Sequence, residues 1–219
     1  MIKVEHIEVF NWEGAIRGMR NPLNSWEKSD SEWKFTGYSS KAERGTHEYI
    51  IGEADLALMR KLCRAGSDHR KFLRQIMVSM DITAPLYWWK EFDTYKVGTV
   101  ANSCSTMHTI HKKPFELDDF SIEHLSIKNY TRFVNTTLSW LNESLDDYLR
   151  TNDKADWWQI IQLLPTTYNQ KRTVTLNYEV LLNMYHARRN HKLDEWRAFC
   201  GYIEEMPYFA EICLEGDNG

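Results

Sequence analysis

The chain has 219 residues, of which 42% are hydrophobic and 26% charged, and its net charge at pH 7 is −4. This length and composition predict a single folded domain over residues 1–219, with a substantial core, rather than a disordered chain. The slightly acidic balance excludes a general nucleic-acid binder, so a phosphate-bearing ligand would have to be held by local arginines and lysines.

The first fifty residues alternate between ordered patterns and turns. Apolar and charged residues alternate over 2–10, which predicts a half-buried strand, although the alternation slips between Val4 and Ile7. Gly, Asn and Pro divide 11–26 into a helix and a turn. Residues 27–47 are polar and rich in serine, and we expect them to form a surface excursion.

The next sixty residues contain the clearest local signals. Apolar residues at helical spacing predict a helix over 53–66, and strict alternation predicts a strand over 75–82. An aromatic stretch, 85–96, follows. Residues 97–108 are small, hydroxylated and nearly uncharged, which suits either a plain loop or a segment whose backbone approaches a ligand closely.

The last ninety residues are predominantly helical. Periodic leucines predict a long helix over 129–150, and a shorter helix over 153–164 should stop at Pro165. Residues 173–196 have the pattern of an amphipathic helix that runs into a second one, and 193–206 closes the chain. Taken together, the pattern predicts an α+β domain with a small, mostly antiparallel sheet and several long helices.

Cellular context follows from the cysteines and the N-terminus. The four cysteines show neither a CxxC pair nor metal-ligand spacing, so we expect no metal site and no disulfide framework. The N-terminus carries acidic residues where a signal peptide needs an apolar segment, and no apolar run is long enough to cross a bilayer. We therefore expect a cytoplasmic protein that has no membrane partner.

One helical stripe carries polar residues at both of its ends. Asn177 and Arg188 stand eleven residues apart, which is almost three helical turns, and Leu181 and Met184 lie between them. An arginine in an apolar stripe needs an anionic or hydrogen-bonding partner, because an unpaired buried charge is very costly. That partner is either a ligand or a carboxylate of the protein itself, and the residues alone leave both alternatives open.

The order of residues around this stripe resembles the C-terminal signature of the flavin-dependent thymidylate synthases. In that family a Leu-Pro step, a Thr-rich turn and Thr-Val-Asn precede a helix that ends in Leu-Arg. "LLPTTYNQKRTVTLNYEVLLNMYHARR" has Leu164, Pro165, Asn177, Asn183 and Arg188 at the same spacing. Upstream, "HRKFLRQIMVSMDITAPLYWW" and "IRGMRNP" resemble two further family segments, in the family's order.

The family's most diagnostic motif is degenerate in this chain. That motif reads Arg-His-Arg, two residues, Ser, one residue, Asn-Glu, two residues, Ser, one residue, Arg. A gap-free count from Pro85 places Thr94 to Lys96 on Arg-His-Arg, and a shift of one residue instead aligns Asn102 and Ser105 with its Asn and second Ser. At most one lysine replaces two arginines, and the Glu and final Arg are lost. Each lost charged donor removes about 1.5–3 kcal/mol from an anion site. Candidates to replace those donors are Lys90, Lys96, His108, Lys112 and Arg189.

The resemblance implies roles for eight residues. Arg188 would contact a pyrimidine ring and favour its ionisation at N3, which makes C5 nucleophilic. Flavin contacts are implied at His69, Asn177 and Asn183. Lys96 is a candidate for a flavin or a nucleotide contact, and Asn102, Ser103, Ser105 and Arg188 are candidates for nucleotide contacts. Asn183 points roughly 120° away from Asn177 around the helix, so it would serve the site of a neighbouring subunit in the family's homotetramer.

Two functional hypotheses follow. The first is a divergent enzyme that transfers a methyl or hydroxymethyl group to C5 of a pyrimidine deoxynucleotide such as dUMP. By resemblance it would use FAD, with NADPH and methylenetetrahydrofolate as co-substrates. The second is a family member that has lost catalysis and binds a nucleotide or a protein partner. A changed loop also leaves a cytosine nucleotide open as the substrate, and Cys104 is the one thiol in that loop.

Overall fold

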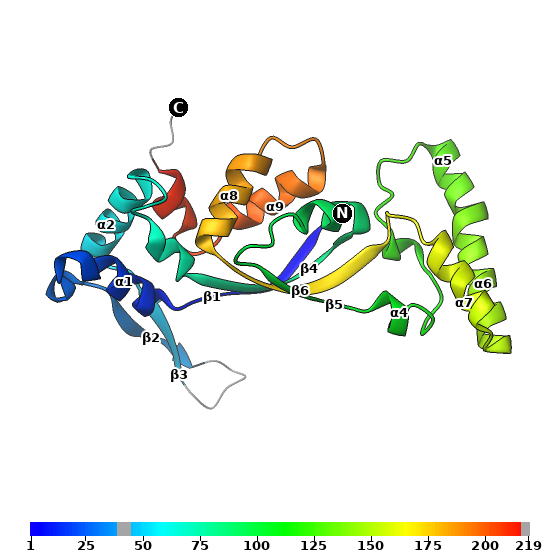
Figure 1. Ribbon diagram of the computed structural model, residues 1–219, viewed down its shortest axis with the longest axis horizontal. Coiled ribbons are helices and arrows are strands. Elements are labelled where there is room, and N and C mark those ends of the chain that lie inside the picture. Colours follow the sequence, from blue (N-terminus) through cyan, green and yellow to red (C-terminus); the bar gives the residue numbers. More distant parts are fainter. Residues whose placement is uncertain (39–44, 216–219) are drawn as a thin grey trace.

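The computed structural model describes residues 1–38 and 45–215. Figure 1 shows an elongated molecule with a sheet at its centre, α1, α2 and a hairpin at one end, and α5 to α7 at the other. The strands are β1 (Lys3–Phe10), β2 (Glu32–Tyr38), β3 (Gly45–Ile50), β4 (Met77–Pro85), β5 (Val100–Ser103) and β6 (Asn169–Asn177). The α-helices are α1 (Trp12–Arg20), α2 (Glu53–Arg64), α3 (Leu86–Phe92), α4 (Thr106–Thr109), α5 (Ile127–Arg132), α6 (Ser139–Thr151), α7 (Lys154–Leu163), α8 (Tyr178–Arg188) and α9 (Asp194–Glu204). A π-helix, Phe133–Leu138, joins α5 to α6, and a second, Ala210–Leu214, follows α9.

The central sheet is antiparallel and has the strand order β1-β4-β6-β5. The strand predicted over 75–82 is its central β4, whose apolar side chains at Val78, Met80 and Ile82 are almost completely buried. The residues between them turn to the other face of the sheet, as the period of two requires. The α+β prediction with a small antiparallel sheet is confirmed.

The slip in the first strand is a β-bulge. The register of β1 against β4 shifts between Glu5 and Glu8, and His6 has a positive φ of 53°. A bulge inserts one residue, so the side chains beyond it change faces. This explains why the alternation resumes one residue late at Ile7.

Part of the excursion expected over 27–47 is a second, two-stranded sheet. β2 and β3 pair antiparallel, with Trp33 opposite Tyr49 and Phe35 opposite His47, and residues 39–44 lie outside the described residues. The prediction missed these strands because Trp33 and Phe35 are 59% and 53% exposed. Strands that bury little apolar surface have no strong sequence pattern.

The boundary between β6 and α8 corrects the expectation of a helix from residue 173. Residues 173–177 are the end of a strand paired with β4, in which Thr175 stands opposite Ser79. The β-branched residues of "TVTL" suit that strand. Asn177 is the N-cap of α8, and its Oδ1 accepts a hydrogen bond of 3.1 Å from the backbone N–H of Val180. The expected stripe is otherwise in place, since Leu181 and Met184 are fully buried.

Segment 97–108, for which the sequence left a plain loop and a ligand-approaching segment open, contains regular secondary structure. Its first half contains β5, a short strand whose four residues are all exposed, and its second half contains α4. β5 lies at the edge of the sheet beside β6, with Ser103 opposite Arg172. The small, hydroxylated side chains therefore face solvent from an edge strand, which is where such residues are tolerated best.

The helices α6 and α7 form a second, smaller core with the segment before α5. Leu141 and Leu145 of α6 and Ile160 of α7 are buried there. Pro165 follows α7 by two residues, so the predicted stop is confirmed. Over residues 1–38 and 45–215, no helix is both long and apolar enough to cross a bilayer, and no three His, Cys, Asp or Glu side chains gather as metal ligands would.

Candidate functional site

Arg188 is the last residue of α8, and it contacts a carboxylate of the same chain. Its Nη1 donates to Oε2 of Glu91 over 2.9 Å, and its Nε donates to the hydroxyl of Tyr95 over 3.0 Å. The guanidinium carbon lies 4.9 Å from the ring centre of Trp196 and 5.7 Å from that of Tyr95. The Arg188 side chain is still 21% exposed. Of the two alternatives that the sequence left open, the protein's own carboxylate is therefore present.

Glu91 joins three elements at this point. Besides Arg188, its Oε2 accepts a hydrogen bond of 3.0 Å from Nε1 of Trp196, and Nε2 of His191 lies 3.4 Å away. α3 carries the acid, α8 the arginine and α9 the tryptophan. Nη2 of Arg188 makes no hydrogen bond to any described residue, so the guanidinium keeps one open edge for a ligand.

A cavity lies next to this arginine. It has a volume of about 260 Å³ and is lined by Phe92, Asp93, Tyr95, Lys96, Thr99 and Ala101. Tyr95 therefore links the cavity wall to Arg188. The hydroxyl of Thr99 is buried and has no hydrogen-bond partner among the residues that the structure describes. A buried hydroxyl without a partner is unusual, and it offers a polar contact to a molecule in the cavity.

A second arginine, which the sequence analysis missed, contacts Asp93, one of the residues that line the same cavity. Arg172 lies 4.2 Å above the ring centre of Trp89, and its Nη1 donates to Oδ1 of Asp93 over 2.7 Å. Its side chain is 15% exposed. Arg172 stands opposite Ser103 in the sheet, and only the strand register brings it there. Local sequence carries no signal for this placement.

The N-terminus of α8 lies against the loop between α3 and β5. A Cβ added to Gly98, whose φ is +76°, would lie only 3.1 Å from Nδ2 of Asn177. Gly98 is thus required both by its backbone angle and by this close approach. Asn177 and Arg188 both lie beside this loop, which carries Lys96, through Gly98 and Tyr95 respectively, and Asn102 and Ser103 follow on β5.

His69 and Asn183 lie on a different side of α8. Arg70 makes two hydrogen bonds, of 2.9 and 3.1 Å, to the carboxylate of Glu179, and Asn183 is one turn beyond Glu179. At about 100° per residue, Asn183 points roughly 140° away from Arg188. His69 and Asn183 are both exposed, as is Lys96. The predicted residues therefore form two groups. Lys96, Asn102, Ser103, Asn177 and Arg188 lie at or near the segment that follows α3, and His69 and Asn183 lie on the other side of α8. Ser105, the N-cap of α4, follows the first group along the chain.

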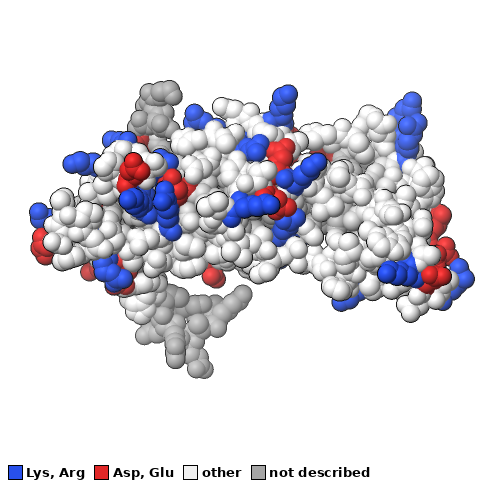
Figure 2. All heavy atoms as spheres, viewed as in Figure 1, with Lys and Arg blue, Asp and Glu red and all other residues white. Residues whose placement is uncertain are grey.

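Charges of both signs share one face of the molecule. On the described residues of the face in Figure 2, lysines and arginines are interspersed with acidic residues, and they form no continuous basic area. This agrees with the net charge of −4. An anionic ligand would be attracted by single arginines rather than by the field of the molecule.

The thiols near the site differ in exposure, which predicts different reactivities. Cys104 follows β5 and is exposed, whereas Cys200 is buried in α9. Burial, with the charge of Glu204 second, raises the pKa of Cys200 to about 11. Since the thiolate is the nucleophile, we expect iodoacetamide to alkylate Cys104 at least about a hundred times faster than Cys200 at pH 8. Peptide mapping by mass spectrometry measures both rates. In guanidinium chloride the two rates should become similar, and equal rates in the folded protein would contradict this prediction.

Comparisons with known proteins complete the description. No family model matches the sequence, and no curated protein matches it. Solved structures do match. Thymidylate synthase X (ThyX) from Helicobacter pylori, solved with FAD and dUMP, superposes with a TM-score of 0.65 over 98% of this chain and 96% of that one, at 17% sequence identity. The fold is that of the flavin-dependent thymidylate synthases.

Two further structures agree with this assignment of the fold. A second structure of the flavin-dependent thymidylate synthase ThyX from Helicobacter pylori, complexed with FAD and dUMP, gives a TM-score of 0.64 over 98% of this chain and 97% of that one, at 17% identity. The UMP/dUMP methylase PolB from Streptomyces cacaoi, bound with 5-Br dUMP, gives 0.59 over 97% and 91%, at 14% identity. The predicted flavin-dependent thymidylate synthase-like architecture is confirmed. At these identities, function has to be argued from the site.

Proposed function

We propose that the chain binds a pyrimidine deoxynucleotide such as dUMP and transfers a methyl or hydroxymethyl group to C5 of its base. The position of Arg188 carries this proposal. Its guanidinium lies against the rings of Trp196 and Tyr95, and its Nη2 has no hydrogen-bond partner among the described residues. Tyr95, to which it donates a hydrogen bond, lines a cavity. Donors fixed in place before a ligand arrives stabilise charge that develops on it. Arg188 would orient the base and stabilise negative charge at N3.

The residues around α8 fit a flavin when two protomers contribute to one site. Asn177 and Lys96 belong to the group of predicted residues near Arg188. There the absence of a Cβ at Gly98 leaves room beside Nδ2 of Asn177. His69 and Asn183 face the other way and would hold the flavin of a neighbouring protomer, which requires the proposed homotetramer. Bound FAD, reduced by NADPH, would supply the electrons for a transfer in which methylenetetrahydrofolate supplies the carbon.

Two cations would take over the nucleotide phosphate from the arginines that the degenerate motif lacks. Lys96 lines the cavity and is exposed, and Arg172 of β6 contacts Asp93, which lines it too. Asn102 and Ser103 lie beside Arg172 on the edge strand and would add neutral donors. Because Arg172 is already paired with Asp93, this anion site would be weaker than one built from unpaired arginines.

A second candidate function is binding without catalysis. The ion pair between Arg188 and Glu91 favours it, because the charge that would activate the base is already balanced within the protomer. A nucleotide would then be held by the same pocket, without flavin chemistry.

Flavin and nucleotide titrations separate the two candidates. We expect the purified protein to be yellow, or to bind added FAD in a ratio near one to one, as measured by its visible spectrum. We also expect it to release tritium from C5 of labelled dUMP in the presence of NADPH and methylenetetrahydrofolate. No flavin binding at tens of micromolar, with dUMP still bound in calorimetry, would support the second candidate. If neither ligand binds, both candidates are overturned.

A further inference from the structure

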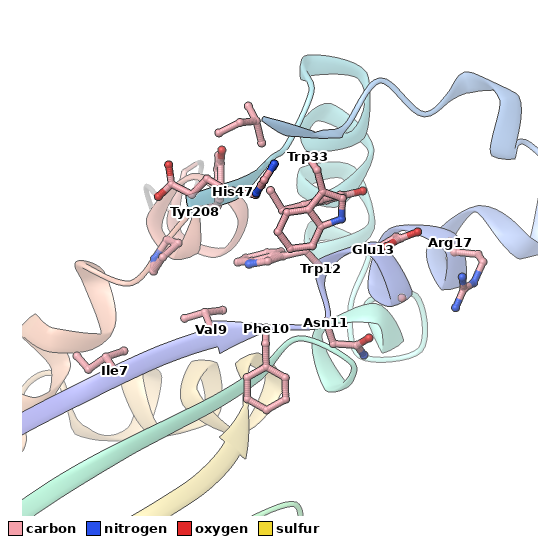
Figure 3. Close-up of a pocket in the computed structure, with 15 residues that line it drawn as sticks. Ile7, Val9, Phe10, Asn11, Trp12, Glu13, Arg17, Trp33, His47 and Tyr208 are labelled. Atoms are coloured by element: carbon pink, nitrogen blue, oxygen red, sulfur yellow. The ribbon is translucent and has the colours of Figure 1, made fainter. Parts of the chain in front are cut away.

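A second cavity lies at the end of the molecule that carries the β2–β3 hairpin. It has a volume of about 630 Å³ and is lined by β1, the start of α1, the β2–β3 hairpin and the turn at Tyr208. Cavities of roughly 300–1,000 Å³ are the usual size for small-molecule sites. Its lining shares no residue with the cavity beside Arg188. Figure 3 shows the indole of Trp33, from the hairpin, beside that of Trp12, from α1.

The aromatic rings of this cavity lie at steep angles to one another. Trp33 and Tyr49 have ring centres 5.2 Å apart and planes at 68°, and Trp12 and Tyr208 have centres 5.7 Å apart and planes at 77°. Parallel rings would form a slot for a flat heterocycle. Nearly perpendicular rings instead form the walls of a box, which suits a compact, rounded group. Trp33 is 59% exposed on the hairpin, so a large part of its surface is available to a ligand.

Two carboxylates accompany the rings. Glu13 and Glu48 line the cavity, and neither makes a hydrogen bond or an ion pair with any described residue. The one arginine in the lining, Arg17, turns its guanidinium away from the two tryptophans (Figure 3). Burial raises the pKa of Tyr49, and the negative charges of Asp55 and then Glu13 raise it further, so acidic groups act on this ring.

The backbone at the base of the cavity is held in unusual conformations. Tyr208 has a φ of +57° and Asn11 a φ of +69°. For a bulky residue such as tyrosine this region is a true outlier and costs about 1–3 kcal/mol. The Tyr208 hydroxyl accepts a hydrogen bond from the backbone N–H of Ile51 at the end of the hairpin, which fixes the ring against the hairpin. Strain of this kind gathers at binding sites, where it positions a side chain.

We propose that this cavity binds a small organic cation, of the quaternary ammonium or protonated amine class, among the rings of Trp12, Trp33, Tyr49 and Tyr208. Aromatic faces attract cations through the negative potential of their π-systems. Glu13 and Glu48 add charge complementarity, and they disfavour anionic ligands. The volume exceeds that of a bare trimethylammonium group, so the natural ligand carries a further body. This site is independent of the proposed nucleotide site.

Choline and its uncharged carbon isostere, dimethylbutanol, test the proposal because they share shape and differ in charge. In calorimetry we expect choline to bind with a Kd on the order of 1 mM and the isostere about tenfold more weakly. Equal binding of the two compounds would show an apolar pocket without cation preference. No choline binding at roughly 50 mM would show no site. Either result overturns the proposal. Co-sedimentation with phosphatidylcholine vesicles, added to choline binding, would identify a lipid headgroup as the source of the cation.

Matched variants locate the site. Trp33→Leu should weaken choline binding about tenfold, whereas Trp140→Leu, on α6 and 53% exposed, should leave it unchanged. The double variant Glu13→Gln, Glu48→Gln keeps the shape of the cavity. We expect it to abolish the preference for choline over the isostere without loss of thermal stability. If the preference survives the double variant, the carboxylates have no part in binding and the proposal is wrong.

Discussion

Replacing Asp55 by asparagine is expected to destabilise the protein by about 3–5 kcal/mol, which is the cost of breaking a buried ion pair from one side. The Asp55 side chain is completely buried, and its Oδ1 accepts a hydrogen bond of 2.6 Å from Nε of Arg20. Its Oδ2 accepts from the hydroxyls of Ser29 and Ser31 at 2.7 and 2.6 Å, and from the backbone N–H groups of Asp30 and Ser31 at 3.2 Å. In asparagine, the NH2 group would face some of these N–H and O–H donors and could not accept hydrogen bonds from them. Arg20 would also lose its counter-charge.

The contribution of the Asp55 carboxylate to the free energy of unfolding depends on pH, and the direction of that dependence follows from its pKa. Burial alone would raise the pKa of Asp55, but hydrogen bonds from Ser29, Ser31 and Arg20, with the charge of Arg20, lower it overall. An unfolded aspartate titrates near pH ~3.9. The stabilisation is therefore complete above that pH and is lost as the pH falls through the lower pKa of the folded state. In Asp55→Asn, which has no carboxylate at this position, the free energy of unfolding should therefore fall less steeply with decreasing pH than in the wild type.

Urea denaturation at pH 7 and over the range below pH 5 measures both effects. Asp146→Asn is the matched control, because Asp146 is exposed on α6 and its change should stay within about 0.5 kcal/mol. The melting temperature of Asp55→Asn should fall by roughly 6–20 °C for a chain of this size. A destabilisation below about 1 kcal/mol would contradict the prediction. It would mean that the ion pair between Arg20 and Asp55 contributes no more stability than a pair of well-packed apolar side chains would.

The Asp55 network also marks a limit of sequence analysis. Arg20 belongs to "IRGMRNP", a segment that resembles the synthases, yet in the structure it holds Asp55 and the turn before the hairpin. Asp55 itself stands in a helix predicted correctly from its periodicity. Because the pair joins residues 35 positions apart, no local pattern identifies it. Strands and helices that bury one face were predictable, whereas polar contacts between distant elements were not.

In the candidate site, too, residues within a local sequence pattern were predicted, whereas residues brought together by packing were missed. The resemblance selected Asn177 and Arg188, and both lie beside the loop that corresponds to the degenerate motif. Glu91 and Arg172 were missed because they become neighbours of Arg188 and the cavity only through α3 packing and the strand register. The aromatic stretch 85–96 drew attention as a pattern, and the carboxylate of Glu91 within it is the partner of Arg188. A charged residue among aromatic ones is a signal that could have found Glu91, since such a charge needs a partner.

Arg188→Ala is expected to weaken dUMP binding between about tenfold and a hundredfold, since a charge-assisted hydrogen bond is worth about 1.5–3 kcal/mol. Loss of the guanidinium also leaves Glu91 as a bare negative charge beside an anionic ligand. The fold should persist, because Glu91 keeps its hydrogen bond from Trp196 and the arginine is partly exposed. Calorimetric titration with dUMP gives the affinity, and thermal unfolding gives the stability. Arg150→Ala, on α6 and with a side chain 72% exposed, is the matched control and should bind dUMP as the wild type does.

The companion variant Glu91→Gln distinguishes a ligand-binding arginine from one that serves only to hold α8 against α3. If Arg188 binds the nucleotide, removal of the competing charge releases the guanidinium, and dUMP affinity should rise severalfold while Arg188→Ala lowers it. If the pair is purely structural, both variants lose similar stability, and neither changes affinity beyond what that loss explains. Opposite shifts in affinity therefore cannot arise from the salt bridge alone. Equal losses of stability with unchanged affinity would remove Arg188 from the site, and with it the observation on which the proposed chemistry rests.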